Sequence, residues 1–446
     1  DIEMTETALA PLGHELTRVA QTPATCVAAG EKEHWTCERC GALFADEEGS
    51  EALSAADIVL PATGVHSYGE DHFCTVCGAA DPAYAPEGNA TAGLIYELSE
   101  DGTYAVLTGT EEEFSVSDVV IASEYNGVPV AEIAAEAFKD NTAIRTVFVP
   151  DSVKKIGASA FAGCTLEAIT LPFVGGGTAE NGYLAYLFGG LSAQSGWSYV
   201  PSSLKSVTLT GGDSIADYAF YNCRSIEKVV LPEGLVSVGK YAFGNCEGLL
   251  GIDLPAGVTQ MGEYAFYNCG NIRSFRVPEG VTELSRALFM GCSRLKEVIL
   301  PAGLTAVGEG AFMDCGALRA VELPASVQAI GARAFKNCDS LRTFEVPADI
   351  AALEEGVFEG CGSLVGVSVP DSVTRIGENA FAGCASLTSI ALPEGLILLS
   401  DGVFSSCKAL VSVALPSTLE EIGEGAFAGC SSLRGIDIPA SVSRIG

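Results

Sequence analysis

Hydrophobic residues recur along most of the chain with a fixed period of 23 residues. The clearest marker is a phenylalanine followed three residues later by a cysteine. Two early copies carry Phe161 with Cys164 and Phe138 with Asn141. Because one such unit cannot bury its own apolar face, the period predicts a solenoid of stacked units. The cysteines of the uninterrupted run are Cys223, Cys246, Cys269, Cys292, Cys315, Cys338, Cys361, Cys384, Cys407 and Cys430.

Within a unit, the pattern predicts one strand facing an aromatic wall. In the unit that begins at Leu295, the residues Leu295, Val298 and Leu300 follow the spacing L-x-x-V-x-L, whose last part alternates as in a strand. Pro301 ends the strand because it has no N–H to donate to the next turn. A glycine, an alanine and Phe312 are expected to form the opposite wall, where the small residues allow close backbone approach.

Stacking the units turns the repeated cysteine into a ladder of buried thiols. The side chains of neighbouring turns point the same way, which leaves their Cβ atoms further apart than a disulfide prefers. Asn141 at the same position favours a packing role. We expect free structural thiols, with disulfides or metal binding as the open alternatives.

The strings LPEGLVSVGKYAF and VPDSVKKIGASAF, each followed by the Phe–Cys spacing, resemble the BspA-like (Treponema-type) leucine-rich-repeat family of bacterial surface proteins. The resemblance covers roughly residues 118–446. It implies a curved parallel β solenoid, a location at the bacterial cell surface or in the medium, and a role in adhesion or host-protein binding. It does not imply a particular ligand.

Residues 86–117 precede the repeats and are predicted to cap the solenoid. Two short alternating runs, Leu94–Leu98 and Tyr104–Leu107, flank Asp101 and Gly102, which is typical of a β-hairpin. The first turn of a solenoid leaves an apolar end uncovered, so a hairpin at this place serves as its cap.

An insertion at about 173–203 interrupts the period, because Phe161 and Phe220 are 59 residues apart. It is dense in aromatic residues and contains several glycines. Two interpretations are open: the rings pack on the flank of the solenoid and hold the insertion down, or they form a recognition loop for glycan or protein. In the second case the candidate ligand-binding residues are Trp197 and Tyr199.

Residues 1–85 carry two small Cys/His modules with the ligand types and C-x2-C spacing of a structural zinc site. The resemblance extends to such modules beside repeat arrays of gut bacterial surface proteins. Structural zinc is the preferred interpretation of the first module, and disulfides such as Cys37 with Cys40 or free thiols are the alternatives. The candidate ligands are His14, Cys26, Cys37 and Cys40 in the first module and His66, His72, Cys74 and Cys77 in the second.

Charge and composition narrow the function. A net charge of −33 repels nucleic-acid phosphate and anionic lipid, so neither is an expected partner. No run of apolar residues approaches the length of a membrane span, and DIEMTETALAP lacks the basic start and apolar run of a signal peptide.

All four histidines precede the repeats, which excludes Ser-His-Asp and Cys-His mechanisms from residues 86–446. We therefore expect no enzyme. We expect an adhesin that recognises host protein or glycan through the solenoid, and the alternative is a spacer that presents other surface domains.

The outward strand positions of three successive turns define a further candidate, called here the small-residue patch. Positions 3 and 5 of L-x-x-V-x-L are expected to line the concave sheet. The preceding turns carry Arg or Lys at position 2, whereas these three turns have no charge there. Either short neutral side chains simply favour strand packing, or the patch contacts a flat partner or a neighbouring copy. Its candidate residues are Val365, Ser368, Thr388, Ser389, Ala391, Val411, Ser412 and Ala414.

Overall fold

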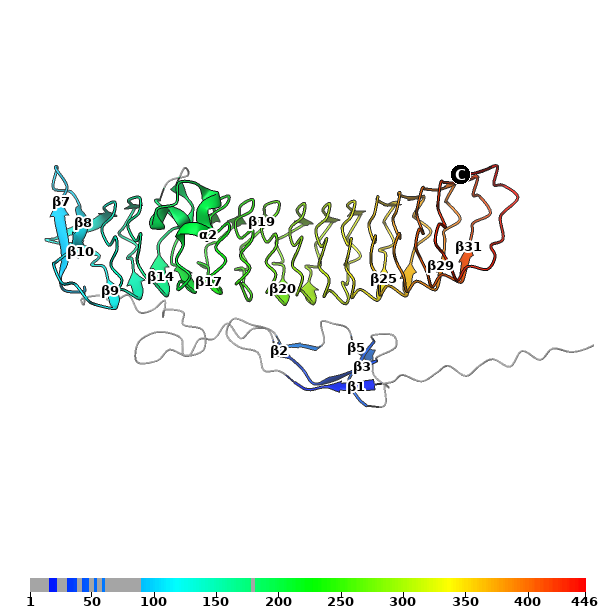
Figure 1. The fold of residues 1–446 in the computed structure, drawn as a ribbon, viewed down its shortest axis with the longest axis horizontal. Helices are drawn as coiled ribbons and strands as arrows, with labels where there is room; N and C mark the ends of the chain where they lie inside the picture. The colour runs from blue at the N-terminus through cyan, green and yellow to red at the C-terminus, as the bar shows by residue number, and fades with distance from the viewer. Residues whose placement is uncertain are drawn as a thin grey trace, which may run out of the picture. The chain divides into compact units, whose positions relative to one another are not determined.

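The computed structural model describes residues 16–21, 30–37, 42–47, 52–53, 58–60, 90–177 and 181–446. The chain divides into two compact units, residues 1–64 and 65–446. No helix among the described residues is long and apolar enough to cross a membrane. Figure 1 shows both units, and each is described by itself.

The first unit consists of short antiparallel strands. One sheet has the order β1-β3-β4-β5, and β2 pairs with β6. Its described core contains Cys37, Phe44 and Ile58, together with the buried His34. The strands are β1 (Leu16–Val19), β2 (Gly30–Glu31), β3 (His34–Cys37), β4 (Leu43–Phe44), β5 (Ala52–Leu53) and β6 (Val59–Leu60).

The second unit is the predicted parallel β solenoid, and one short strand from each of most turns forms its first row (Figure 1). Strands pair in parallel with the partner one turn away, as Glu297 does with Ser274. In β22 the central Val298 is buried, while the residues on either side are partly exposed, as the alternation predicts. The first-row strands are β9 (Asp118–Val120), β12 (Thr146–Phe148), β14 (Ala168–Leu171), β15 (Ser206–Leu209), β17 (Lys228–Val230), β20 (Ser274–Arg276), β22 (Glu297–Ile299), β25 (Thr343–Glu345), β27 (Gly366–Ser368), β29 (Ser389–Ala391) and β31 (Ser412–Ala414).

A second row of parallel strands, mostly of two residues each, lies on the other side of each turn. In most of these strands one side chain enters the core, as Val307 and Ile330 do in neighbouring turns, whereas both residues of the last strand are exposed. These strands are β11 (Val128–Ile133), β13 (Lys155–Ile156), β16 (Ser214–Ile215), β18 (Ser237–Val238), β19 (Gln260–Met261), β21 (Glu283–Leu284), β23 (Ala306–Val307), β24 (Ala329–Ile330), β26 (Ala352–Leu353), β28 (Arg375–Ile376), β30 (Leu398–Leu399), β32 (Glu421–Ile422) and β33 (Arg444–Ile445).

The repeated phenylalanines form a continuous stack through the core. From Phe220 to Phe427, adjacent rings are nearly parallel and their centroids lie between 5.1 and 5.8 Å apart. The rings from Phe220 to Phe404 are fully buried. The wall expected opposite the first-row strands is therefore confirmed, and the turns interlock through it.

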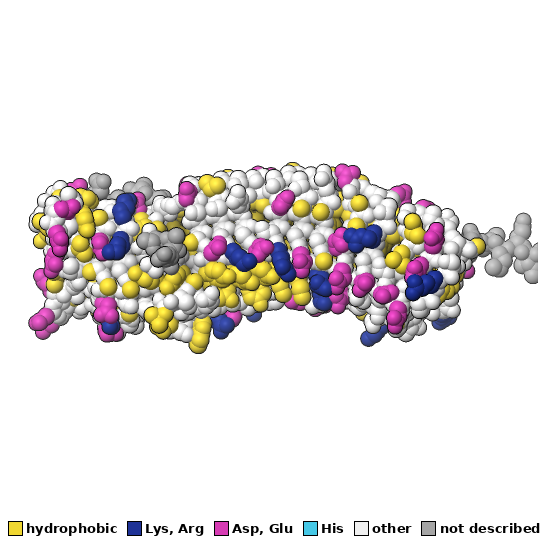
Figure 2. All heavy atoms as spheres, turned by 90° about the horizontal axis from the view of Figure 1, so that it is seen from above, with side chains coloured by type: hydrophobic (Ala, Val, Ile, Leu, Met, Phe, Trp, Pro, Cys, Tyr) yellow, Lys and Arg dark blue, Asp and Glu magenta, His cyan; other side chains and the backbone are white. Residues whose placement is uncertain are grey.

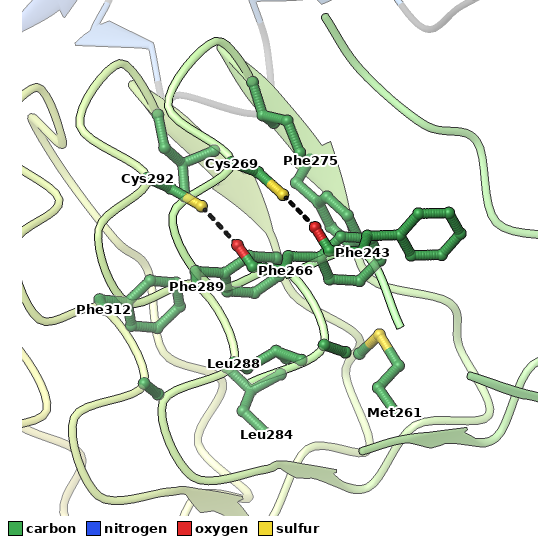
Figure 3. Packing of buried hydrophobic residues seen from close by; sticks show 14 of the residues in the cluster. Phe243, Met261, Phe266, Cys269, Phe275, Leu284, Leu288, Phe289, Cys292 and Phe312 are labelled. Atoms are coloured by element: carbon green, nitrogen blue, oxygen red, sulfur yellow. Dashed lines mark hydrogen bonds between the residues drawn. The ribbon is translucent and has the colours of Figure 1, made fainter. Parts of the chain in front are cut away.

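The repeated cysteines are free thiols, and from Cys223 to Cys407 they are buried. Each Sγ–H from Cys246 onward donates to the backbone carbonyl of a phenylalanine in the preceding turn. Figure 3 shows Cys269 and Cys292 bonded in this way to the carbonyls of Phe243 and Phe266, at 3.1 and 3.2 Å. The same carbonyl oxygen also accepts the backbone N–H of the cysteine in its own turn, as that of Phe243 does from Cys246 at 3.1 Å, so each thiol adds a hydrogen bond between neighbouring turns. Asn141 takes the same place, because its amide nitrogen donates to the carbonyl of Phe114 at 3.4 Å.

The N-terminal cap of the solenoid is the predicted hairpin. Strand β7 (Leu94–Leu98) pairs antiparallel with β8 (Ala105–Thr110). β8 then pairs in parallel with β11, which also pairs antiparallel with β10 (Glu124–Tyr125). Ala105 and Leu107 are completely buried, so the hairpin covers the apolar end of the first turn.

Candidate binding surfaces

Of the predicted metal ligands, only Cys37 lies among the described residues. Its side chain is buried, and its backbone N–H donates to the carbonyl of Ala42 at 2.9 Å. Within the described part of the chain, no group of three or more His, Cys, Asp or Glu side chains could hold a metal ion. The zinc sites stay a prediction, because these candidate ligands lie outside the described residues: His14, Cys26, Cys40, His66, His72, Cys74 and Cys77.

The aromatic insertion is one long turn of the solenoid. Ala168 in β14 pairs with Ser206 in β15, so this turn spans 38 residues. Its first half contains the 3-10 helix η2 (Leu184–Phe188), which enters the core. The ring centroid of Phe188 lies 6.4 Å from that of Phe161. The N–H of Phe161 donates to the carbonyl of Leu187 at 2.8 Å. These contacts attach the insertion firmly to the turn below it.

The second half of the insertion holds large side chains in solvent. It contains the 3-10 helix η3 (Ala193–Ser195) and the short helix α2 (Gly196–Tyr199). Leu191, Trp197 and Tyr199 are 87%, 66% and 41% exposed. Phe188 therefore anchors the insertion, as the first interpretation expects, whereas Trp197 and Tyr199 are exposed to solvent.

The small-residue patch lies on the first-row strands β27, β29 and β31. Ser389 pairs opposite Ser412, and Ala391 pairs opposite Ala414. These four side chains are exposed, while the residues between them, Ile390 and Val413, point into the core. The patch is thus a flat sheet surface of mostly small side chains, beside which Val411 is 57% exposed.

Five tyrosines form a further surface that the sequence argument missed. Tyr218, Tyr241 and Tyr264 each precede the Ala-Phe pair of their unit, and Tyr221 and Tyr267 follow the phenylalanine. Their rings lie in mutual contact and are partly exposed. The signal was available in the three consecutive units YAFYNC, YAFGNC and YAFYNC, where both positions flank the buried ring.

A family model described as BspA type leucine rich repeat region, in six copies, matches residues 123–175, 213–342 and 328–446. The chain belongs to this family. The gap between residues 175 and 213 coincides with the aromatic insertion, so the BspA-type repeat and the insertion are distinguishable in sequence as well as in structure.

Solved structures that are similar to this chain include those of three bacterial proteins. A leucine-rich repeat protein from Bacteroides ovatus is 24% identical, with 79% of this chain and 95% of that chain covered and a TM-score of 0.46. A leucine rich cell surface protein from Faecalibacterium prausnitzii is 25% identical, with 80% and 95% covered and a TM-score of 0.35. The pneumococcal vaccine antigen PcpA is 18% identical, with 80% and 93% covered and a TM-score of 0.34. No curated protein matches the chain.

Proposed function

We propose that this BspA-type chain is a non-enzymatic binding protein whose solenoid recognises a host or cell-surface protein or glycan. One observation carries the proposal: an insertion anchored by buried Leu184, Leu187 and Phe188 displays Leu191 and Trp197 to solvent. Large apolar side chains held exposed on a rigid element are typical of binding hot spots. A pure spacer, the alternative function, has no need of them.

The small-residue patch is the second candidate contact surface of the same function. It is uncharged on a chain of net charge −33, and its paired strands leave the exposed Ser389, Ala391, Ser412 and Ala414 on one flat face. A flat partner, or a neighbouring copy, fits such a surface better than a small molecule does, because no anchor or pocket is present on these strands.

We further propose that the protein acts outside the cell, at the bacterial surface or after secretion. The family resemblance and the high negative charge, which favours solubility, support this location. Labelling intact cells with an antibody raised against the solenoid tests it. Labelling only after the cells are lysed would contradict it.

The function is tested with arrays of purified extracellular matrix proteins and of defined glycans. The purified chain is expected to bind at least one of them. Trp197→Ala is expected to weaken that binding at least tenfold if the insertion is the site, because truncating a central aromatic anchor typically costs at least about 2 kcal/mol.

The double variant Ser389→Lys with Ser412→Lys is the matched test of the small-residue patch. Both serines are exposed, so the fold tolerates lysine there, and unchanged thermal unfolding is the control. If binding survives in this variant but is lost in Trp197→Ala, the insertion is the site and the patch is not. If the wild-type chain binds nothing on either array, the proposed function is wrong and the spacer becomes the better account.

A further inference from the structure

The tyrosines belong to a longer apolar surface, called here the aromatic strip, on the face of the solenoid that carries α2. Methionines replace the tyrosine after the phenylalanine in the next two turns, and then Lys336 ends the series. Figure 2 shows hydrophobic side chains gathered in a continuous area on this face, beside a row of charged side chains. The strip consists of Tyr218, Tyr221, Tyr241, Tyr264, Tyr267, Met290 and Met313, all of them partly exposed.

The rings of the strip hold one another in place. Tyr241 stacks on Tyr264 with centroids 4.5 Å apart and planes 5° apart, and it stacks on Tyr218 at 5.2 Å. Tyr221 and Tyr267 meet Tyr241 at right angles, at 5.6 and 6.2 Å. The stack is therefore preorganised, and few of its side chains have to become ordered when a partner binds.

Gly244 makes this arrangement possible. It occupies the position that is tyrosine in the turns before and after it, and it is buried. A Cβ atom at Gly244 would lie 2.8 Å from a ring carbon of Tyr221 and 3.1 Å from one of Tyr241. The missing side chain thus leaves the space in which these two rings meet.

The edges of the strip are polar, and the charged and amide side chains along them pair with one another. Along one edge, Lys240 pairs with Glu263 at 2.6 Å, and Arg286 pairs with Glu309 at 3.2 Å. Along the other edge, the side-chain amide of Asn245 donates to Asn222 and that of Asn268 donates to Asn245, at 2.8 and 3.0 Å. An apolar centre rich in Tyr and Met with a polar rim is the composition of a protein–protein interface.

The strip is continuous with the insertion. The side-chain amide of Asn222 donates to the carbonyl of Gln194 at 2.9 Å. A Cβ atom at Gly196, the first residue of α2, would lie 2.4 Å from the carbonyl oxygen of Tyr221. The exposed Trp197 therefore stands on an element that packs directly against the first turn of the strip.

We propose that the aromatic strip, together with α2, docks a folded protein partner through a flat apolar face that is neutral or basic. This proposal rests on the binding function proposed above and selects protein over glycan as its ligand. A sugar stacks on the open face of an aromatic ring, whereas the faces of Tyr218, Tyr241 and Tyr264 are turned toward one another. The methionines and Leu191 add aliphatic contact area that a glycan does not use.

Size and charge agree with this partner. Four steps of about 4.8 Å separate the turns of Tyr218 and Met313, so the strip alone extends about 20 Å. With α2 added, the length approaches the roughly 30 Å across which a standard interface buries about 800 Å² per partner. The cations Lys240 and Arg286 are paired with carboxylates, and the chain carries a net charge of −33, so an acidic partner is repelled.

The test compares one substitution at two turns of the repeat. Met290→Lys places a cation inside the strip, in the fourth of its five turns, and Ser405→Lys places it at the equivalent position far outside the strip. Lysine is compatible with this position, because Lys336 occupies it in the native chain. Both variants and Tyr267→Ala are assayed on the array of extracellular matrix proteins and the glycan array, with thermal unfolding as the control for folding.

The expected result is that the wild-type chain binds a protein, that Met290→Lys and Tyr267→Ala bind it at least tenfold more weakly, and that Ser405→Lys binds as the wild type does. Binding to glycans alone would overturn this inference while leaving the proposed function intact. Protein binding that is unchanged in Met290→Lys would also overturn it. A wild-type chain that binds nothing would overturn the proposed function itself.

Discussion

The buried cysteine ladder is expected to make the solenoid unfold in mild alkali. Burial raises the pKa of the Cys246 and Cys292 thiols to about 12, and it moves the pKa of Cys269 and Cys315 well above the ordinary value. A cysteine in an unfolded chain ionises near pH 8.5. Between these two pKa values the unfolded chain has lost protons that the folded chain keeps, so stability falls as the pH rises. Below about pH 8 this contribution is present almost in full.

The magnitude follows from the number of buried thiols. At pH 9, a thiol that ionises only on unfolding lowers the free energy of unfolding by about 0.8 kcal/mol relative to pH 7. Nine consecutive repeat thiols from Cys223 to Cys407 are buried. Together they lower the free energy of unfolding by about 7 kcal/mol, which is comparable with the whole stability of an ordinary domain. The result is the same for any folded-state pKa above about 10.

The assay is urea unfolding followed by circular dichroism at pH 7, 8 and 9. The triple variant Cys269→Ala, Cys292→Ala and Cys315→Ala should reduce the pH dependence by about a third, whatever its stability at pH 7, because it removes three of nine coupled protons. Native thiols should also react with iodoacetamide only after unfolding, since the thiolate is the reactive form. Equal unfolding midpoints at pH 7 and pH 9, or rapid labelling of the native chain, would refute the reasoning.

Two further predictions concern the core and the N-terminal modules. Phe312→Ala should cost roughly 3–5 kcal/mol, because the ring is fully buried between Phe289 and Phe335, and hydrogen exchange should show the loss concentrated in neighbouring turns. Phe427→Ala, at a partly exposed ring, is the control and should cost less in the same urea titration; equal costs would contradict a packing origin. Elemental analysis of protein purified without added metal should find about one zinc per chain. A metal-free chain with Cys37 bridged to Cys40 would rule out the predicted ligand set, which is His14, Cys26, Cys37 and Cys40.

The sequence predicted the elements whose signal repeats or is local. The 23-residue period located the stacked phenylalanines and the buried thiols of the repeat, because every turn meets the same environment and therefore selects the same residue. The alternation around Val298 and the stop at Pro301 placed the first-row strand. Asp101 and Gly102 between two alternating runs located the capping hairpin, because a hairpin is specified by its own turn.

The tertiary structure alone decided features that depend on contacts between turns. Second-row strands such as β23 have two residues, too few for an alternating pattern, and they exist only because the next turn pairs with them. The hydrogen bond from the Cys292 thiol to the carbonyl of Phe266 likewise joins residues that are 26 positions apart in the sequence.

For the candidate surfaces, too, the sequence indicated some features and the tertiary structure alone decided others. Composition marked the insertion as aromatic, but only packing separated the anchor Phe188 from the exposed Trp197. Tyr241 is unremarkable in its own unit and gains its role from the rings of the turns before and after it. A repeat sequence specifies what each turn must bury, because burial is the same in every turn. What the stacked turns display together depends on side chains that meet only once the solenoid is assembled.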